Sequence, residues 1–389
     1  MAHLLVTNDF PPKIGGIQSY LWELWRRLPP GEAVVMTTPH AESADFDRAA
    51  PMPIIRTRQR WLLPTPSLER QILRVARQHQ IGLIVLDPAL PVGWLARRLR
   101  RKGFRVGVVV HGAEVTVPGR LPGTRQLLAG VLRNVDLVVA AGGYPLAEAE
   151  RAANISLPSI VIAPGIDIRR FTPTVESAKP VIRERLGLPR SGPLLVSTSR
   201  LVPRKGRDVL IAAGGRLVPE FPDLCIAISG SGRDLDRLRK LAKRQRGLDV
   251  RFVGRLSDED LADLYRCADL FVMLCRNRWG GLEQEGFGIV FLEAAASGVA
   301  QVAGRSGGSH EAVAHNETGV IVDRPRRSKD AAVVIAKLLN DATARGLMGE
   351  AGRRRVVTTS TYDLLAERLN IALRSVAEQQ IHDESINPA

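Results

Sequence analysis

Short runs of aliphatic and β-branched residues alternate with helical stretches from one end of this chain to the other. Such alternation is typical of parallel sheets whose strands are joined by crossover helices. Thirteen strands are expected, at residues 4–7, 33–37, 54–57, 83–86, 106–110, 137–140, 160–163, 194–198, 225–229, 250–253, 270–273, 299–303 and 319–322. The pattern predicts an α/β fold with doubly wound parallel sheets, which bind ligands beyond the carboxyl ends of their strands.

The length of the chain indicates that these strands form two domains. The chain has 389 residues, whereas a single hydrophobic core rarely grows beyond about 250–300 residues. Proline and glycine follow the seventh strand at Pro164-Gly165, which is typical of the end of an element. We expect two Rossmann-like domains facing across a cleft, over residues 1–165 and 166–361, and a last helix over 362–378 that is a candidate to pack back on the first domain.

The net charge of the chain predicts an acidic partner. The formal charge is +15 at pH 7, which nucleic acid, anionic lipid or a phosphorylated substrate would each complement. No apolar run reaches the length of a bilayer span, and the first residues lack a signal segment, so we expect a cytoplasmic protein. The three cysteines lack metal or redox spacing and are expected to be buried free thiols; they are Cys225, Cys267 and Cys275.

Two basic segments of the first half combine arginines with apolar anchors. The segment Arg97–Lys102, with Arg105 just beyond it, follows Trp94, and the segment Arg56–Arg60 leads into Trp61. Basic residues beside aromatic anchors suit the face of an anionic bilayer. A solvated surface explains each segment equally well, so both interpretations stay open.

The most specific motif begins at Glu285 and runs through a glycine-rich turn into a helix that carries Glu293. Gly286 and Gly288 allow the backbone to approach a ligand closely, and the start of the helix offers unpaired N–H groups to an anion. Glu285 and Glu293 can accept hydrogen bonds from hydroxyl groups on the two sides of a bound diphosphate. The motif predicts a nucleotide-sugar site, and the alternative is an amphipathic helix with two solvated glutamates.

Two further segments of the second domain fit the same interpretation. Arg200 and Lys205 lie in the loop after the strand at 194–198, where two cations can stabilise the charge that develops on a diphosphate leaving group. A second glycine turn, Gly304–Gly308, follows the strand at 299–303. Two glycine turns after two buried strands indicate one site, although surface salt bridges are an alternative for the two cations.

The first domain has two loops of interest at the carboxyl ends of its strands. The loop Asn8–Gly16 ends in a glycine pair at the expected start of a helix, where glycine allows a phosphate to meet backbone N–H groups. It is not a dinucleotide fingerprint, and a simple tight turn is the alternative. His111 follows the strand at 106–110 and is well placed to hydrogen-bond a sugar hydroxyl or share a proton, although a structural histidine is also possible.

Together these residues resemble the retaining GT-B glycosyltransferases of family four. The resemblance covers nearly the whole chain, and the spacing of Glu285 and Glu293 is its most specific part. Within the family, four segments resemble actinobacterial phosphatidylinositol monomannoside mannosyltransferases that use GDP-mannose; they are Val6–Pro12, Gly15–Tyr20, Cys275-Arg276 and Gly286–Glu293. The resemblance implies mannosyl transfer to an anionic glycolipid by a peripheral protein on the inner face of the plasma membrane.

The resemblance also implies roles for individual residues on the donor side. Arg200 and Lys205 would hold the diphosphate, Glu293 the ribose and Glu285 the transferred sugar. The backbone N–H groups of the turn would bind sugar and phosphate; they belong to Phe287, Gly288 and Ile289. Family members need no protein nucleophile and no metal bound by paired aspartates, so we expect no cofactor.

On the acceptor side, the resemblance implies that His111 holds the sugar near the leaving oxygen. Asp9, Gly15 and Gly16 would border the acceptor, with Gly16 also close to the diphosphate. The catalytic set expected from the resemblance is His111, Arg200, Lys205 and Glu285.

Three other functions remain open at this point. A family-four transferase could use another nucleotide sugar and a soluble or polysaccharide-precursor acceptor. A nucleic-acid-binding protein would explain the charge, but aromatic residues make up only 5% of the chain and do not interleave with the basic segments. A sensor that binds a nucleotide sugar without turnover is disfavoured by the presence of Arg200, Lys205 and Glu285.

Overall fold

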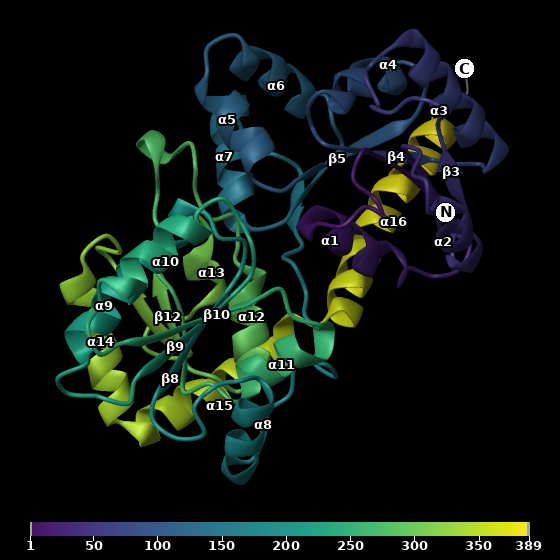
Figure 1. The fold of residues 1–389 in the computed structure, drawn as a ribbon. Coiled ribbons are helices and arrows are strands. Elements are labelled where there is room, and N and C mark those ends of the chain that lie inside the picture. Colours follow the sequence, from purple (N-terminus) through teal and green to yellow (C-terminus); the bar gives the residue numbers. More distant parts are fainter. Residues whose placement is uncertain (1, 387–389) are drawn as a thin grey trace. The chain divides into compact units, whose positions relative to one another are not determined.

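The computed structural model describes residues 2–386, with side chains described as far as residue 378. It contains two parallel sheets, one of seven strands in the order β3-β2-β1-β4-β5-β6-β7 and one of six in the order β10-β9-β8-β11-β12-β13 (Figure 1). All thirteen expected strands are present, most with ends within a residue of those predicted, and β7 and β12 each differ by two residues at one end. The prediction of doubly wound α/β sheets is confirmed.

The chain forms two compact units, and it crosses between them twice. Unit 1 ends at Gly165 and takes up the chain again from Tyr362, and unit 2 is Ile166–Thr361. The strands of unit 1 are β1 (His3–Thr7), β2 (Ala33–Thr37), β3 (Ile54–Arg56), β4 (Leu83–Asp87), β5 (Arg105–Val110), β6 (Leu137–Ala140) and β7 (Ser159–Val161). Its helices are α1 (Gly16–Trp25), α2 (Ser43–Ala49), α3 (Pro66–Gln78), η1 (Val92–Leu95), α4 (Ala96–Arg100), α5 (Ala113–Arg120), α6 (Thr124–Leu132), α7 (Gly143–Ala153) and α16 (Tyr362–Ile386).

Unit 1 buries both faces of its sheet, because successive side chains of a strand point to opposite faces. Leu4 and Val6 of β1 pack into a core that α3, α4, α5, α6 and α7 cover. Leu5 faces the other way, into a core that α1 and α16 close. In Figure 1, α16 is the yellow helix that lies beside α1.

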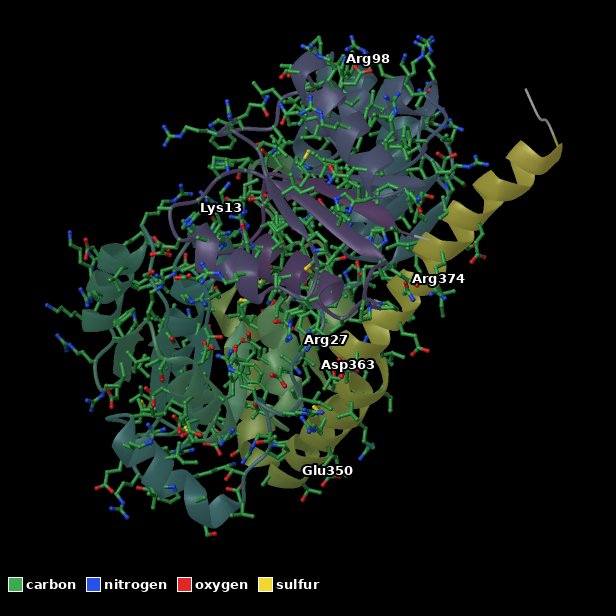
Figure 2. All side chains as sticks on the ribbon, turned by 90° about the vertical axis from the view of Figure 1, so that its right-hand side faces the viewer. Lys13, Arg27, Arg98, Glu350, Asp363 and Arg374 are labelled. Carbon is green, nitrogen blue, oxygen red and sulfur yellow. The ribbon has the colours of Figure 1, made fainter. Side chains whose placement is uncertain are left out.

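Helix α16 is joined to unit 1 by apolar contacts and by ion pairs. Leu365, Leu369 and Leu373 recur at helical spacing and are buried against the same core as Trp25. At the start of the helix, Arg27 Nε lies 2.7 Å from Asp363 Oδ1, and Figure 2 shows the two residues side by side. Arg374, farther along the helix in Figure 2, pairs with Glu32.

Unit 2 has the same architecture with different loops. Its strands are β8 (Leu194–Thr198), β9 (Cys225–Ser229), β10 (Asp249–Gly254), β11 (Leu270–Met273), β12 (Gln301–Gly304) and β13 (Gly319–Val322). Its helices are η2 (Glu176–Ala178), α8 (Lys179–Arg185), η3 (Pro203–Lys205), α9 (Arg207–Leu217), α10 (Leu235–Lys243), α11 (Asp258–Arg266), η4 (Trp279–Gly281), α12 (Ile289–Ala296), α13 (Ser309–Ala312), α14 (Ser328–Asn340) and α15 (Ala342–Thr359).

One face of the unit 2 sheet packs against α9, α10 and α14, and the other carries a chain of aromatic contacts. Leu195 and Ile226 belong to the first face. On the second face, the ring of Phe271 lies 5.5 Å from those of Tyr265 in α11 and Phe291 in α12. Both helices are thereby fixed against β11, and each carries a side chain of the site described below.

The three cysteines are free and buried, as predicted. Among the helices that the structure describes, none combines the length and the apolar character needed to cross a bilayer.

Candidate functional site

At the carboxyl edge of the unit 2 sheet, Glu285 accepts from two cations at one carboxylate oxygen. Glu285 Oε2 lies 2.6 Å from Lys205 Nζ and 2.7 Å from Arg204 Nη1. The carboxyl group is buried, which alone would raise its pKa, but the charges of Lys205 and Arg204 outweigh burial and hold the pKa of Glu285 at about 2. Glu285 is therefore ionised at any physiological pH.

The two glycine turns of unit 2 pack directly on each other. The backbone N–H of Glu285 donates to Ser306 Oγ at 3.2 Å, and the N–H of Gly308 donates to the carbonyl of Glu285 at 2.9 Å. Gly307 has a φ of +46°, and a Cβ there would lie 2.0 Å from the Glu285 carbonyl oxygen. Only glycine allows the second turn to approach so closely, and the approach fixes the backbone that carries Glu285.

Helix α12 begins immediately after this turn. Gly288 is its N-cap residue, with a φ of +93° in the left-handed region. The turn residues Phe287, Gly288 and Ile289 thus stand at the positive end of the helix dipole, where an anion is stabilised.

Glu293 lies within α12, and a tyrosine from a neighbouring helix holds it. The Tyr265 hydroxyl donates to Glu293 Oε2 at 2.5 Å and also contacts Thr198 Oγ1 at the end of β8. Burial raises the pKa of Glu293, and the hydrogen bond from Tyr265 opposes that rise. Tyr265 has no signal in the local sequence, because it is 28 residues from Glu293 and meets it only through the packing of α11 on α12.

The loop after β8 is more basic than its two predicted cations suggest. Lys205 is buried against Glu285, whereas Arg200 is exposed, and no described residue pairs with its guanidinium. Arg204 also belongs to this loop, and Arg207 is the first residue of α9. The sequence interpretation gives neither residue a role. Their proximity to Lys205 in the sequence was the available signal. Gly206, between them, has a φ of +71°, and a Cβ there would lie 1.9 Å from the Leu274 carbonyl oxygen.

At the carboxyl edge of the unit 1 sheet, His111 pairs with an aspartate that the sequence interpretation missed. His111 Nε2 lies 2.8 Å from Oδ1 of Asp87, the last residue of β4, and Asp87 Oδ2 accepts from Thr7 Oγ1 at 2.5 Å. Burial lowers the pKa of His111, but the carboxylates of Asp87, Glu114 and Asp9 outweigh burial, so the net shift is upward. These carboxylates therefore stabilise the imidazolium form relative to a free histidine.

Asp9 lies beside this pair at the end of β1. Its backbone N–H donates to Thr7 Oγ1 at 2.8 Å, and its Oδ1 accepts from Gln18 Nε2 at 2.6 Å. Burial, together with the charge of Asp87, raises the pKa of Asp9. Strands β1, β4 and β5 are neighbours in the sheet, and Asp9, Asp87 and His111 lie at their carboxyl ends. This arrangement brings Asp9 and His111 together around Asp87.

The glycine pair of unit 1 differs from the glycines of unit 2. Gly15 is extended, with a φ of 168°, and caps α1, which begins at Gly16. A Cβ on Gly15 would meet the flexible end of Gln18, whereas a Cβ on Gly16 would meet no atom within 4 Å. The space in front of Gly16 is open to a ligand.

The structure corrects the interpretation of the two basic segments. Arg56 pairs with Asp47 at 2.6 Å and donates to two backbone carbonyls, so it is a structural residue. Arg100 and Arg105 both pair with Asp136, at 3.2 and 3.1 Å. Arg98 is exposed and pairs with Glu69 at 3.4 Å. The exposed basic residues beside the apolar anchors for which no described residue forms an ion pair are Arg58, Arg60, Arg97, Arg101 and Lys102. Trp61 is 70% exposed.

Comparison with known proteins points to one family. Residues 178–355 match the family model described as glycosyl transferases group 1. A GDP-mannose-dependent monoacylated alpha-(1-6)-phosphatidylinositol monomannoside mannosyltransferase from Corynebacterium glutamicum is 38% identical over 376 residues, which cover 96% of this chain and 97% of that protein. A GDP-mannose-dependent alpha-(1-6)-phosphatidylinositol monomannoside mannosyltransferase from Mycobacterium tuberculosis is 39% identical over 380 residues, covering 95% and 97%.

Solved structures share the fold at lower identity. The Anabaena protein HepE, crystallised with UDP, superimposes with a TM-score of 0.78 at 21% identity, over 96% of this chain and 100% of that one. Sucrose-phosphate synthase from Thermosynechococcus elongatus superimposes with a TM-score of 0.76 at 22% identity, over 97% and 99%.

Proposed function

The chain belongs to the family-four GT-B glycosyltransferases, and we propose that it transfers mannose from GDP-mannose to a phosphatidylinositol mannoside-type glycolipid. The names of its actinobacterial relatives support this donor and acceptor. The observation that carries the proposal is the ionised Glu285, held by Lys205 and Arg204 at the carboxyl edge of unit 2. A site with this charge pattern suits a sugar diphosphate, because it offers cations to the phosphates and a carboxylate to the sugar hydroxyls.

We assign the donor roles as follows. Arg200 and Lys205 bind the diphosphate and stabilise the charge that develops on it as the glycosidic bond breaks. Glu285 accepts from hydroxyls of the transferred sugar, and Glu293, held by Tyr265, accepts from the ribose. The backbone of Phe287, Gly288 and Ile289 binds sugar and phosphate oxygens at the start of α12.

Arg204 joins this assignment because it shares the Glu285 oxygen with Lys205. When the diphosphate binds, the cations gain a second anion to neutralise, and Glu285 is released to accept from the sugar. We propose no metal for the reaction, since the cations of this loop supply the positive charge that the leaving diphosphate requires.

We further propose that transfer retains the anomeric configuration, by attack of the acceptor hydroxyl on the face from which the phosphate leaves. The C1–O bond to the phosphate breaks as the bond to the acceptor oxygen forms, and a phosphate oxygen takes the acceptor proton. No protein nucleophile takes part. We assign Asp9, Gly15 and Gly16 to the acceptor side, with Gly16 also beside the diphosphate, and His111 to a sugar hydroxyl near the leaving oxygen.

The proposed place of action is the cytoplasmic face of the plasma membrane. The exposed Trp61, Leu63 and Trp94 are the apolar anchors. The exposed basic residues beside them supply the charge; they are Arg58, Arg60, Arg97, Arg101 and Lys102. Attraction to anionic lipid falls with salt, because exposed charges are screened over about 10 Å at 0.1 M. Binding to phosphatidylglycerol vesicles should therefore weaken between 0.05 and 0.5 M salt, and salt-insensitive binding would contradict this surface.

The test of the proposed function is donor and acceptor selectivity. Purified protein is incubated with GDP-mannose, UDP-glucose or UDP-N-acetylglucosamine, with and without phosphatidylinositol monomannoside, and products are identified by mass spectrometry. We expect mannose incorporation from GDP-mannose and only with lipid present. Transfer from a uridine donor, or transfer without lipid, would instead indicate a family-four transferase with a different donor or a soluble acceptor.

A further inference from the structure

Arg207, the first residue of α9, is a buried arginine with almost no partners. Arg207 is only 2% exposed. Nη2 donates to Ser199 Oγ at 2.8 Å, but Nε and Nη1 are buried without a hydrogen-bond partner among the described residues. A buried guanidinium without an anion destabilises the folded protein, because it loses its hydration and gains no counter-charge. Its presence therefore calls for a functional explanation.

A second buried arginine of unit 2 shows that the fold can satisfy such a group completely. Arg183 Nε donates to the Cys267 carbonyl at 3.0 Å, Nη1 to the Gly192 carbonyl at 2.8 Å, and Nη2 to Asp269 Oδ2 at 2.9 Å. Asp269 also accepts from the N–H of Leu194, at the amino end of β8. Arg183 is therefore a structural arginine at the edge of the sheet opposite the candidate site.

Arg207 lies at the carboxyl edge, behind the loop that we assign to the diphosphate. Ser199, its one hydrogen-bond partner among the described residues, donates onward to the carbonyl of Arg200 at 3.2 Å, so the guanidinium supports the backbone that carries Arg200. The carboxylate of Glu285 attracts its charge, and Arg204 repels it. Burial lowers the pKa of Arg207 to about 10, so the group is still charged at neutral pH.

The charges of this segment do not balance in the ligand-free protein. Arg200, Arg204, Lys205 and Arg207 lie within eight residues of the chain. Two carboxylates pair with them among the described residues: Glu285, which Lys205 and Arg204 share, and Glu283, at 3.9 Å from Arg204. The start of α9 adds the positive end of a helix dipole to the same place. The surplus is positive and partly buried, and an anion that reaches this loop would neutralise it.

We propose that Arg207 is a positioning residue of the donor site, whose buried charge is balanced by the diphosphate of the bound nucleotide sugar. It acts through Ser199, which fixes the backbone of Arg200, and through its electrostatic field behind the loop. The inference rests on the proposed function, since it takes the diphosphate to bind at this loop. It follows that the charge of Arg207 strengthens donor binding but lowers the stability of the ligand-free protein.

The test replaces Arg207 with methionine, which keeps the length and removes the charge, and uses Arg183→Met as the matched control. Thermal unfolding is followed without ligand, and binding of GDP and GMP is measured by calorimetry. For Arg207→Met we expect a melting temperature at or above that of the unmodified protein, GDP binding weaker by about tenfold, and GMP binding weaker by less than about threefold. Arg183→Met should lower the melting temperature and leave GDP binding within about twofold.

Arg207→Lys provides a second readout that does not depend on how the methionine variant folds. A buried lysine loses its proton more readily than a guanidinium, so GDP binding by this variant should weaken from pH 6 to 9 relative to the unmodified protein. The groups that interact with residue 207 keep their charge state over this range. Burial raises the pKa of Cys275 to about 12 and holds the pKa of Tyr265 well above its usual value, and Glu285 is ionised throughout.

GDP binding that is unchanged in Arg207→Met would overturn the inference, as would a pH dependence in Arg207→Lys equal to that of the unmodified protein. These results are distinct from failure of the proposed function. If the unmodified protein binds neither GDP nor UDP, the donor site itself is contradicted. If it binds GDP and the variants bind equally well, only the role of Arg207 is contradicted.

Discussion

The carboxyl edges of the two sheets have the same architecture and opposite chemistry. In unit 2 the edge carries four cations in the loop and helix start after β8, and two of them, Arg204 and Lys205, pair with Glu285. In unit 1 the edge carries Asp9 and Asp87 with one imidazole, His111, and one lysine, Lys13, whose charge acts on Asp9. The fold sets where ligands can bind, whereas the residues of the first loops decide which charge a ligand must have.

The two edges also differ in how they are held. In unit 2, glycines allow one backbone segment to approach another, as at Gly206 and Gly307. In unit 1, side chains bridge the strand ends, with Asp87 between His111 and Thr7. The unit 2 edge should therefore be sensitive to added atoms, and the unit 1 edge to lost hydrogen bonds.

The largest expected effect is the loss of a cation from the unit 2 edge. Lys205→Ala should lower kcat for mannosyl transfer by about 10²–10³-fold, because a charge aimed at the leaving group is lost, and should change KM for GDP-mannose far less. Steady-state kinetics measure both. Lys243→Ala, on the exposed end of α10, is the control. Near-normal turnover of Lys205→Ala would remove Lys205 from the catalytic assignment.

An added methyl group should have the next largest effect. In Gly206→Ala the new Cβ meets the Leu274 carbonyl at 1.9 Å and displaces the loop that carries Lys205. Since a displacement of about 1 Å can cost about 10²-fold in rate, we expect a loss of that order, measured as kcat. Gly187→Ala is the matched control, because Gly187 also has a positive φ, of 69°, but open space around it. Equal losses in the two variants would contradict the steric argument.

For unit 1, removing one charge should change the titration of the histidine. Asp87→Asn should lower the pKa of His111, measured by NMR titration of the imidazole, and should reduce activity by about tenfold through loss of a positioned hydrogen bond. In the unmodified protein the folded-state pKa is raised above the unfolded value. The stability from this pair is thus fully present below about pH 6.5. It is lost as the pH rises through the folded-state pKa.

The stability difference between the unmodified protein and Asp87→Asn should therefore shrink as the pH rises through that range. Urea unfolding at pH 6 and pH 9 measures it. A difference that grows with pH would show that His111 is not stabilised as an imidazolium.

The smallest expected effect is on the ribose side. Tyr265→Phe removes the hydroxyl that holds Glu293, and a hydrogen bond to a charged group contributes about 1.5–3 kcal/mol at most. We expect GDP binding to weaken by about three- to tenfold, less than in Glu293→Ala, which removes the acceptor itself. Calorimetric titration with GDP compares the two. If Tyr265→Phe binds GDP more weakly than Glu293→Ala does, the expected order of the two effects is contradicted.

Sequence reasoning located the strands and the main motif because both are local patterns. Apolar runs such as Leu194–Thr198 depend on their own residues, and the spacing of Glu285 and Glu293 is set by a single turn and helix. It missed Asp87, which meets His111 across 24 residues, and the pairing of Arg204 with Glu285 across 81. It also predicted that Arg56 lies on the surface, because nothing near Arg56 in the sequence indicates its ion pair with Asp47.

Helix α16 has a consequence for the synthesis of the protein. The strands of unit 1 are complete at β7, but Leu365 and Leu369, which cover one face of its sheet, are translated only after all of unit 2. At about 5–20 residues per second, the roughly 200 residues of unit 2 take about 10–40 s to make. Throughout that time the apolar groove beside Trp25 and Leu21 is open on the ribosome, while unit 2 can finish folding first. The core of unit 1 is therefore covered only when the last helix emerges. Until then, a chaperone could cover it.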